Sequence, residues 1–368
     1  MIIKEITLLN YRNYEKLDLE LNDRFNVIYG NNAQGKTNIL ESLFLCATGR
    51  SHRTAKEREL VRFDQKGYDV NVSLEKKDID IKLEYRFLDG KKFIRVNEIG
   101  IDKLNQLIGN LVVVLFSPED IILLKEDPAG RRRFLDIAIS QVKPSYFHKL
   151  QQYKKVLANR NALLKQLKID NSSYDTLSIW NKSLVEIGSE IIFERIKFIK
   201  RLEDIINPKH LYLTNDKENV TIRYKDKLYL NNENSLVEIA NTFLERLQSK
   251  VKEDLYKTYT SIGPHRDDFE IELNGINVKN YGSQGQQRTI MLSLKLAEID
   301  IIKESIGEYP ILLLDDFASE LDRQRHEKFI KSLDSMQTFI TSTNKDIIKG
   351  IQNNVKYFYV ENGCVVGG

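Results

Sequence analysis

The sequence predicts an α/β fold in which both ends of the chain form one domain and a helical segment is inserted between them. Three patterns lead to this prediction. An apolar strand, a glycine-containing loop and an amphipathic helix follow one another over residues 24–47. Apolar residues alternate with polar ones over 68–99, which is typical of an antiparallel sheet. Ile311–Leu314 is continuously apolar, as a strand buried in a parallel sheet would be.

The N-terminal half of the chain continues these patterns. Period-two alternation begins at Ile2 and predicts strands before the glycine-containing loop. Leu111–Phe116 is an apolar run that predicts a further buried strand. Residues 130–206 and 235–258 have mostly helical periodicity, with Val220–Tyr224 as a candidate strand between them.

The C-terminal part returns to mixed α/β character. Alternation resumes at Phe269, a helix is expected over residues 284–305, and Thr338–Thr341 is a candidate strand. We therefore expect the head domain to comprise residues 1–130 and 255–368, with residues 131–254 forming a helical arm.

Composition restricts the class of protein. The 368 residues are 41% hydrophobic and 30% charged, as in a globular protein, and the net charge is only +3. A nucleic-acid surface would therefore have to be a local basic region. Cys46 and Cys364 form no spaced pair for zinc or disulfides. No run approaches the roughly 20 apolar residues of a membrane span, and Met1–Ile6 does not resemble a signal peptide. We expect a cytoplasmic protein with no membrane partner.

The loop between the first predicted buried strand and its helix matches G-x-x-x-x-G-K-[ST]. It consists of Gly30, Asn31, Asn32, Ala33, Gln34, Gly35, Lys36 and Thr37. In such a loop the backbone N–H groups and the helix N-terminus surround phosphates, the lysine binds the β- and γ-phosphates, and the threonine hydroxyl binds magnesium. The alternative is a chance glycine-rich turn. The order of strand, loop and helix favours a site for ATP and Mg²⁺.

Two carboxylates follow the buried strand Ile311–Leu314. Asp315 is predicted to bind the magnesium, directly or through water, and Asp316 to polarise an attacking water. Together with Lys36 they are the candidate catalytic residues. A strand end capped by acids is the alternative, and the phosphate loop earlier in the chain favours the functional interpretation.

A second candidate phosphate site lies 32 residues before Asp315. Ser283 is a suitable N-cap for the helix that follows, and Gly285 permits close backbone approach. The motif Ser283, Gln284, Gly285 and Gln286 resembles the signature motif of ABC-type ATPases, which binds the γ-phosphate held by the opposite subunit. Residues 319–322 resemble the D-loop of that class.

Five further segments resemble the RecF family of bacterial recombination and repair proteins within that class. They are Leu9–Tyr14, Gly49–Arg53, Phe116–Asp120, Arg131–Asp136 and Gly263–Asp268. The likeness covers nearly the whole chain and is weakest over residues 140–250. The acidic pair is Asp-Asp instead of the Asp-Glu of a generic ABC ATPase, and residues 341–344 contain no switch histidine. Slow ATP hydrolysis is therefore expected.

The resemblance implies a P-loop ABC-type ATPase head, like that of SMC proteins, with an antiparallel β subdomain and an inserted helical arm. It implies an ATP-dependent homodimer that clamps double-stranded DNA and helps to load a recombinase at gapped DNA with RecO and RecR. It also suggests that Arg12 reaches the nucleotide.

Basic residues at two places are candidates for contact with DNA. Arg50 and Arg53 belong to a mixed-charge run, which is also typical of a solvated loop. Arg131 and Arg132 stand where a helix is expected to begin, an unfavourable position for cations that suggests an anionic partner.

Other functional classes remain as alternatives. A P-loop kinase would have no use for Ser283–Arg288 and would not dimerise with ATP. An ABC transport subunit would need a membrane partner. An ATPase fused to a nuclease would need a metal-ligand cluster beyond Asp315 and Asp316, and the sequence contains no such cluster.

Overall fold

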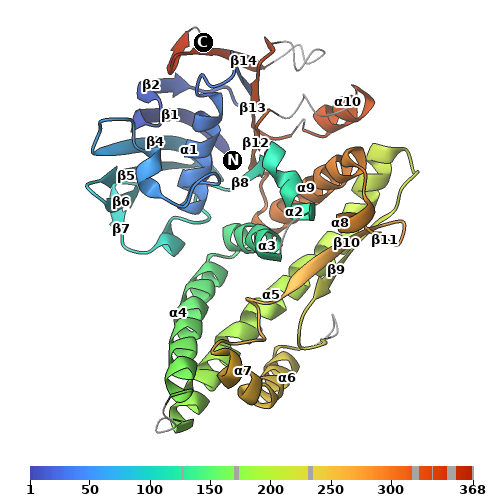
Figure 1. Cartoon of the computed structure of the whole chain (residues 1–368). Helices are drawn as coiled ribbons and strands as arrows, with labels where there is room; N and C mark the ends of the chain where they lie inside the picture. The colour runs from blue at the N-terminus through green and yellow to red at the C-terminus, as the bar shows by residue number, and fades with distance from the viewer. Residues whose placement is uncertain are drawn as a thin grey trace. The chain divides into compact units, whose positions relative to one another are not determined.

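The computed structural model describes residues 1–125, 128–169, 174–230, 235–316, 323–333, 335–345 and 354–366. The chain divides into two compact units (Figure 1). The first unit comprises Met1–Ile121, Lys209–Lys217 and Ser283–Gly368, and the second comprises Ile122–Pro208 and Glu218–Gly282. Among the described residues, no helix has the length and apolar character needed to cross a membrane.

The first unit contains an antiparallel six-stranded sheet with the strand order β2-β1-β4-β5-β6-β7. Alternating residues are buried, for example Val70, Val72 and Leu74 on β4. One face of the sheet therefore packs on the core, as the period-two pattern predicts. The strands are β1 (Ile2–Tyr11), β2 (Tyr14–Glu20), β4 (Gly67–Lys76), β5 (Ile79–Leu88), β6 (Lys91–Val96) and β7 (Ile99–Ile101).

The second sheet of this unit is mostly parallel and has the strand order β15-β14-β3-β13-β12-β8. Because β13 lies between β3 and β12, the strand before the phosphate loop and the strand before the acidic pair are not adjacent. Their carboxyl ends nevertheless share one edge of the sheet, where α/β folds place ligands. The strands are β3 (Phe25–Tyr29), β8 (Val113–Phe116), β12 (Ile311–Leu314), β13 (Thr338–Ser342), β14 (Val355–Glu361) and β15 (Cys364–Val366).

Helix α1 (Lys36–Thr48) contacts both sheets of this unit, namely β8 and β13 of the parallel sheet and β4 and β5 of the antiparallel one. It is therefore buried on almost every side. Helix α9 (Gln284–Ile306) contacts β8 and is likewise buried for most of its length. Among its described residues, the unit also contains the short η1 (Glu57–Leu60), η2 (Leu104–Gln106) and η3 (Pro118–Ile121), α10 (Arg323–Ser332), and residues 209–214 at the end of a long helix, α5 (Tyr174–Thr214).

The second unit consists of helices and a small antiparallel sheet. Its sheet has the order β11-β10-β9, with β9 (Val220–Lys225), β10 (Asp268–Leu273) and β11 (Ile276–Asn277). Its helices are α2 (Ile122–Lys125), α3 (Pro128–Val142), α4 (Pro144–Leu167), most of α5 (Tyr174–Thr214), α6 (Leu236–Ser249), α7 (Val251–Lys257) and α8 (Val278–Tyr281).

The second unit is larger than the arm expected at residues 131–254. Residues 255–282 were expected in the head because their alternation resembles the sheets there. Instead, β10 pairs with β9, with Phe269 opposite Tyr224 and Ile271 opposite Ile222. This pairing places the segment with the helices of the second unit, which also includes residues 122–130.

Candidate nucleotide site

The phosphate loop leaves β3 at Tyr29 and enters α1 at Lys36. Gly30 and Gly35 have φ angles of 147° and 113°, which side-chain-bearing residues rarely adopt. A Cβ atom on Gly30 would also lie 2.3 Å from the carbonyl oxygen of Val360. The two glycines of the motif are thus required by the curvature of the loop and by its close contact with β14.

The Lys36 side chain lies across its own loop. Its Nζ donates hydrogen bonds to the carbonyl oxygens of Gly30 and Asn31, both at 2.7 Å, and the residue is only 9% exposed. Burial lowers the pKa of the Lys36 ammonium, and the charges of Asp316 and Asp315 oppose that shift. The loop therefore holds a cation at its centre, as phosphate binding requires.

The fold brings the two predicted metal-binding residues together across 278 positions of sequence. The Thr37 Oγ1 donates a hydrogen bond of 2.8 Å to Asp315 Oδ1. Thr341 donates a second bond of 2.6 Å to the same oxygen. A hydroxyl and a carboxylate are oxygen ligands of the kind that Mg²⁺ prefers, so this pair is chemically suited to hold that ion.

Thr341 is part of the site although the sequence alone did not identify it. It lies on β13, between the strands that carry the phosphate loop and the acidic pair. Its Oγ1 accepts a hydrogen bond of 2.9 Å from the backbone N–H of Asp316 while it donates to Asp315. Two sequence signals concern Thr341: it ends the candidate strand Thr338–Thr341, and it begins residues 341–344, which contain no switch histidine. Neither signal reveals its partner.

Asp316 has the environment of a candidate proton acceptor. Burial raises the pKa of its carboxyl, the neighbouring charge of Asp315 raises it further, and Lys36 opposes the shift. A raised pKa moves a carboxylate towards the range useful in general-base catalysis.

Arg12 lies beside the phosphate-loop helix, where it binds a buried acid. Its guanidinium donates two hydrogen bonds to Glu41 on α1, at 2.6 and 2.8 Å, and a third of 2.9 Å to the carbonyl oxygen of Glu59. The Glu41 side chain is fully buried and also accepts a 2.5 Å hydrogen bond from Ser51. Burial raises the Glu41 pKa, but the bonds from Arg12 and Ser51 outweigh it, so the pKa is lowered. Contact between Arg12 and a nucleotide stays a prediction.

The signature-like motif begins α9 at the surface of the first unit. Ser283 is the N-cap, as predicted, and its Oγ accepts a hydrogen bond of 3.3 Å from the N–H of Gln286. The Gln286 side chain in turn accepts one of 3.0 Å from the N–H of Ser283. Ser283, Gln284 and Gly285 are exposed, so the positive end of a 23-residue helix faces solvent. The predicted D-loop, residues 319–322, lies outside the described residues.

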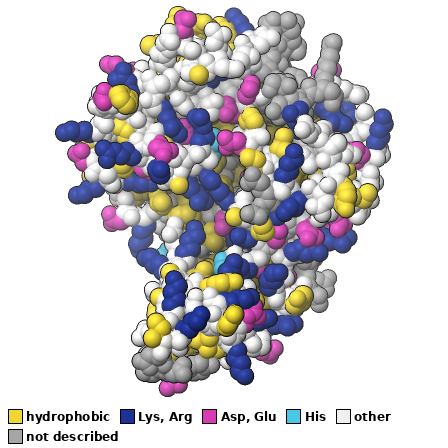
Figure 2. Space-filling view, viewed as in Figure 1, with side chains coloured by type: hydrophobic (Ala, Val, Ile, Leu, Met, Phe, Trp, Pro, Cys, Tyr) yellow, Lys and Arg dark blue, Asp and Glu magenta, His cyan; other side chains and the backbone are white. Residues whose placement is uncertain are grey.

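The candidate DNA contacts in the loop after α1 lie close to the phosphate-loop helix. Arg53 donates a hydrogen bond of 3.0 Å to the Asn38 side chain and lies 3.8 Å from Glu41. Arg50 is half-buried. Figure 2 shows basic and acidic side chains interspersed over the visible face. A role for Arg50 and Arg53 in DNA binding stays a prediction.

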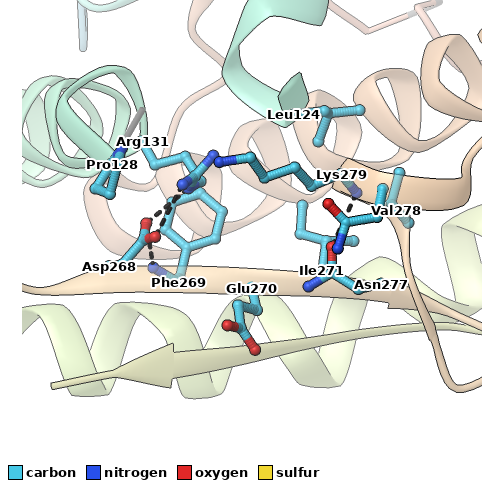
Figure 3. Close-up of a pocket in the computed structure, with 11 residues that line it drawn as sticks. Leu124, Pro128, Arg131, Asp268, Phe269, Glu270, Ile271, Asn277, Val278 and Lys279 are labelled. Carbon is cyan, nitrogen blue, oxygen red and sulfur yellow. Dashed lines mark hydrogen bonds and ion pairs between the residues drawn. The ribbon is translucent and has the colours of Figure 1, made fainter. Parts of the chain in front are cut away.

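Arg131 has a structural position within the second unit. It is buried, and its guanidinium forms a two-pronged ion pair with Asp268 at 2.6 and 2.8 Å (Figure 3). A third hydrogen bond of 3.1 Å goes to the carbonyl oxygen of Leu123. Arg132 donates to the carbonyl oxygen of Asp267 at 2.8 Å. These contacts account for the two arginines without DNA, and duplex binding by them stays untested.

Replacing Arg131 with alanine should therefore destabilise the second unit. The loss leaves Asp268 without its main partner and should lower the free energy of unfolding by about 2 kcal/mol or more. Trp180, the only tryptophan, packs against a cluster of buried leucines in this unit, so its fluorescence during urea unfolding reports the effect directly. Arg133→Ala is the matched control because Arg133 is exposed. An unchanged urea midpoint for Arg131→Ala would argue against a structural role.

The strand order, the phosphate loop and the acidic pair define an ATPase head of the ABC/SMC type. The chain matches the family model described as the RecF/RecN/SMC N terminal domain over residues 2–366. The DNA replication and repair protein RecF of Acetivibrio thermocellus is 49% identical over 350 residues, which are 95% of each chain. That of Clostridium tetani is 45% identical over 99% of this chain and 100% of its own. The chain belongs to the RecF family of DNA replication and repair proteins.

Solved structures agree with this assignment. One of the recombination mediator protein RecF-ATP in the RecFOR pathway has a TM-score of 0.93 and 38% identity, covering 99% of this chain and 97% of its own. The Smc head domain of Pyrococcus furiosus has a TM-score of 0.55 at 16% identity, covering 99% of this chain and 95% of its own. The latter likeness concerns the fold alone.

Proposed function

We propose that this chain is an ATP-gated DNA-binding protein of recombinational repair, in which two copies close on double-stranded DNA and reopen after slow ATP hydrolysis. The observation that carries the proposal is the joining of Thr37 to Asp315 beside a preformed phosphate loop. The RecF-ATP structure, with 38% identity, supports ATP as the nucleotide.

The residues of the loop would bind the triphosphate. Lys36 would exchange its two carbonyl partners for the β- and γ-phosphates, and the backbone N–H groups at the start of α1 would donate to phosphate oxygens. Thr37 and Asp315 would hold Mg²⁺, which neutralises phosphate charge. Asp316 would accept a proton from water.

The second copy would complete this site. Ser283 and its neighbours are exposed at a helix N-terminus, so they are accessible to a nucleotide held by another protomer. A ligand that binds both surfaces at once stabilises the dimer by mass action. The kinase alternative gives no role to this exposed helix start.

The DNA partner and the cellular role rest on family membership. The solved relative is a recombination mediator of the RecFOR pathway, which supports RecO, RecR and DNA as partners. Gapped duplex DNA is proposed as the substrate from the family resemblance. A cytoplasmic location fits that role. Arg50 and Arg53 are the candidate contacts to the phosphates of DNA, because the loop that carries them adjoins the phosphate-loop helix.

ATP should tighten binding to duplex DNA by about tenfold or more, since only the dimer can contact one duplex through both of its copies. Fluorescence anisotropy of a labelled gapped duplex, measured at several salt concentrations with and without ATP, gives both the affinity and the salt slope. Lys36→Met is the control that should lose the ATP effect. Equal affinity and slope with and without ATP in the wild type would contradict ATP gating.

A further inference from the structure

The turn that joins the last two described strands contacts the phosphate loop. Strand β14 runs parallel to β3, with Tyr359 opposite Tyr29, so the turn at Asn362 and Gly363 lies beyond the end of β3, where the loop begins. The backbone N–H of Asn362 donates a hydrogen bond of 2.6 Å to the Gln34 side chain, and that of Gly363 donates one of 3.3 Å to the Gln34 carbonyl oxygen. Asn362 and Gly363, more than 300 positions away in the sequence, thus hold Gln34 of the phosphate loop in place.

Asn13, in the turn between β1 and β2, supports the same position from another direction. Its side-chain amide donates a hydrogen bond of 2.8 Å to the Gln34 carbonyl oxygen. Its side-chain oxygen accepts one of 2.7 Å from Asn38 on α1. The neighbouring Tyr14 hydroxyl donates to the carbonyl oxygen of Gly35 at 3.1 Å. Asn13 therefore connects the loop with the first turn of the helix that follows it.

The phosphate loop, the turn that contains Asn13 and the Asn362-Gly363 turn are closely packed against one another. A Cβ atom on Gly35 would lie 2.4 Å from the Asn13 side chain, and one on Gly363 would lie 2.5 Å from the Asn13 carbonyl oxygen. Gly363 has a φ of 72° and Asn362 one of 50°, the left-handed conformations of a tight Asn-Gly hairpin turn. The loop itself contains Ala33 at a φ of 63°, which a non-glycine residue adopts only when its surroundings enforce it.

We propose that Asn13 and the Asn362-Gly363 turn are positioning elements of the nucleotide site. They fix Gln34 and thereby keep the loop in its phosphate-binding curvature before the nucleotide arrives. Without them the loop must be ordered during binding, and the lost conformational entropy weakens affinity. This inference rests on the proposed function, because it concerns the same nucleotide site.

The effect should appear in nucleotide affinity. Asn13→Ala and Gly363→Ala should each weaken binding of N-methylanthraniloyl-ATP with Mg²⁺ by about three- to tenfold, the range expected for one or two lost hydrogen bonds. The change should lie mainly in a slower association rate, because only molecules whose loop already has the phosphate-binding curvature accept the nucleotide. A purely structural role would instead lower the thermal midpoint and leave the association rate unchanged.

The chain offers a matched control for each variant. Gly275→Ala alters a second Asn-Gly turn, with φ angles of 49° and 78°, at a position where a Cβ has nothing within 4 Å. Asn110→Ala removes another side-chain amide that donates to backbone carbonyl oxygens, those of Gln106 and Leu107. Both controls should keep the wild-type affinity for the nucleotide.

Two outcomes separate this inference from the function on which it rests. If Lys36→Met loses the nucleotide while Asn13→Ala and Gly363→Ala bind it as the wild type does, the positioning role is wrong and the ATP site stands. If Lys36→Met still binds the nucleotide, the proposed function itself fails. Should Gly363→Ala not fold, Asn13→Ala decides the question, because Asn13 is exposed and its replacement removes no core packing.

Discussion

Replacement of Lys36 by methionine is expected to weaken ATP binding by about 100-fold or more. The ammonium is the central cation of the phosphate loop, where two carbonyl oxygens hold it 2.7 Å away. Hydrogen bonds from a charged group to phosphate contribute about 1.5–3 kcal/mol, and 2.8 kcal/mol corresponds to about 100-fold in affinity. Isothermal titration with ATP and Mg²⁺ measures this loss.

The same variant should fold normally. Methionine is an unbranched side chain only one heavy atom shorter than lysine, and it removes a cation whose burial is unfavourable, as the lowered pKa of Lys36 indicates. We expect the thermal midpoint without nucleotide to change by no more than about 3 °C. Lys56→Met, at an 82% exposed side chain, is the control for loss of a lysine. If Lys36→Met bound ATP with near wild-type affinity, the phosphate loop would not be part of the ATP-binding site.

Replacement of Ser283 by arginine is expected to abolish ATP-dependent dimerisation and leave ATP binding by each protomer intact. In the proposed dimer, Ser283 contacts the nucleotide held by the other copy. ATP binding to the phosphate loop of the same protomer therefore does not require Ser283. The variant adds a bulky cation at the positive end of α9 and removes the N-cap bond to Gln286, which costs about 1 kcal/mol. Light scattering with ATP and a parallel ATP titration separate the two properties.

The matched control uses another serine cap. Ser235 is an exposed N-cap of α6 with the same reciprocal bonding, here to Glu238. Ser235→Arg therefore loses a cap of the same kind outside the signature-like motif, and it should still dimerise with ATP. If Ser283→Arg dimerises as well as Ser235→Arg, Ser283 has no place in the dimer interface.

The parts of the site that the sequence predicts are those built from local patterns. The loop Gly30–Thr37 lies between a strand and a helix, and Asp315 follows a buried strand, so both are recognisable without knowledge of the fold. The N-cap role of Ser283 depends only on the helix that it begins. The sequence also predicts most strands of both sheets of the head, because alternating and continuous apolar runs distinguish the antiparallel from the parallel strands, but it does not predict β14 and β15.

The parts that it does not predict depend on which segments become neighbours. Thr341 reaches Asp315 because β13 lies next to β12, and strand order cannot be read from periodicity. Arg131 can be buried because Asp268, 137 residues away, accepts hydrogen bonds from its guanidinium. The extent of the arm was predicted imperfectly for the same reason: the alternation of β10 indicates a strand, and only its pairing with β9 shows to which unit it belongs.

The central claim is that ATP held by the phosphate loop of one protomer joins it to a second. Sedimentation velocity of the wild type, with and without ATP and Mg²⁺, tests this most directly. The proposed function predicts a monomer of 42.9 kDa without nucleotide and a dimer with ATP, while Lys36→Met stays monomeric in both conditions. A wild type that remains monomeric with saturating ATP, or that dimerises equally without it, would contradict the claim.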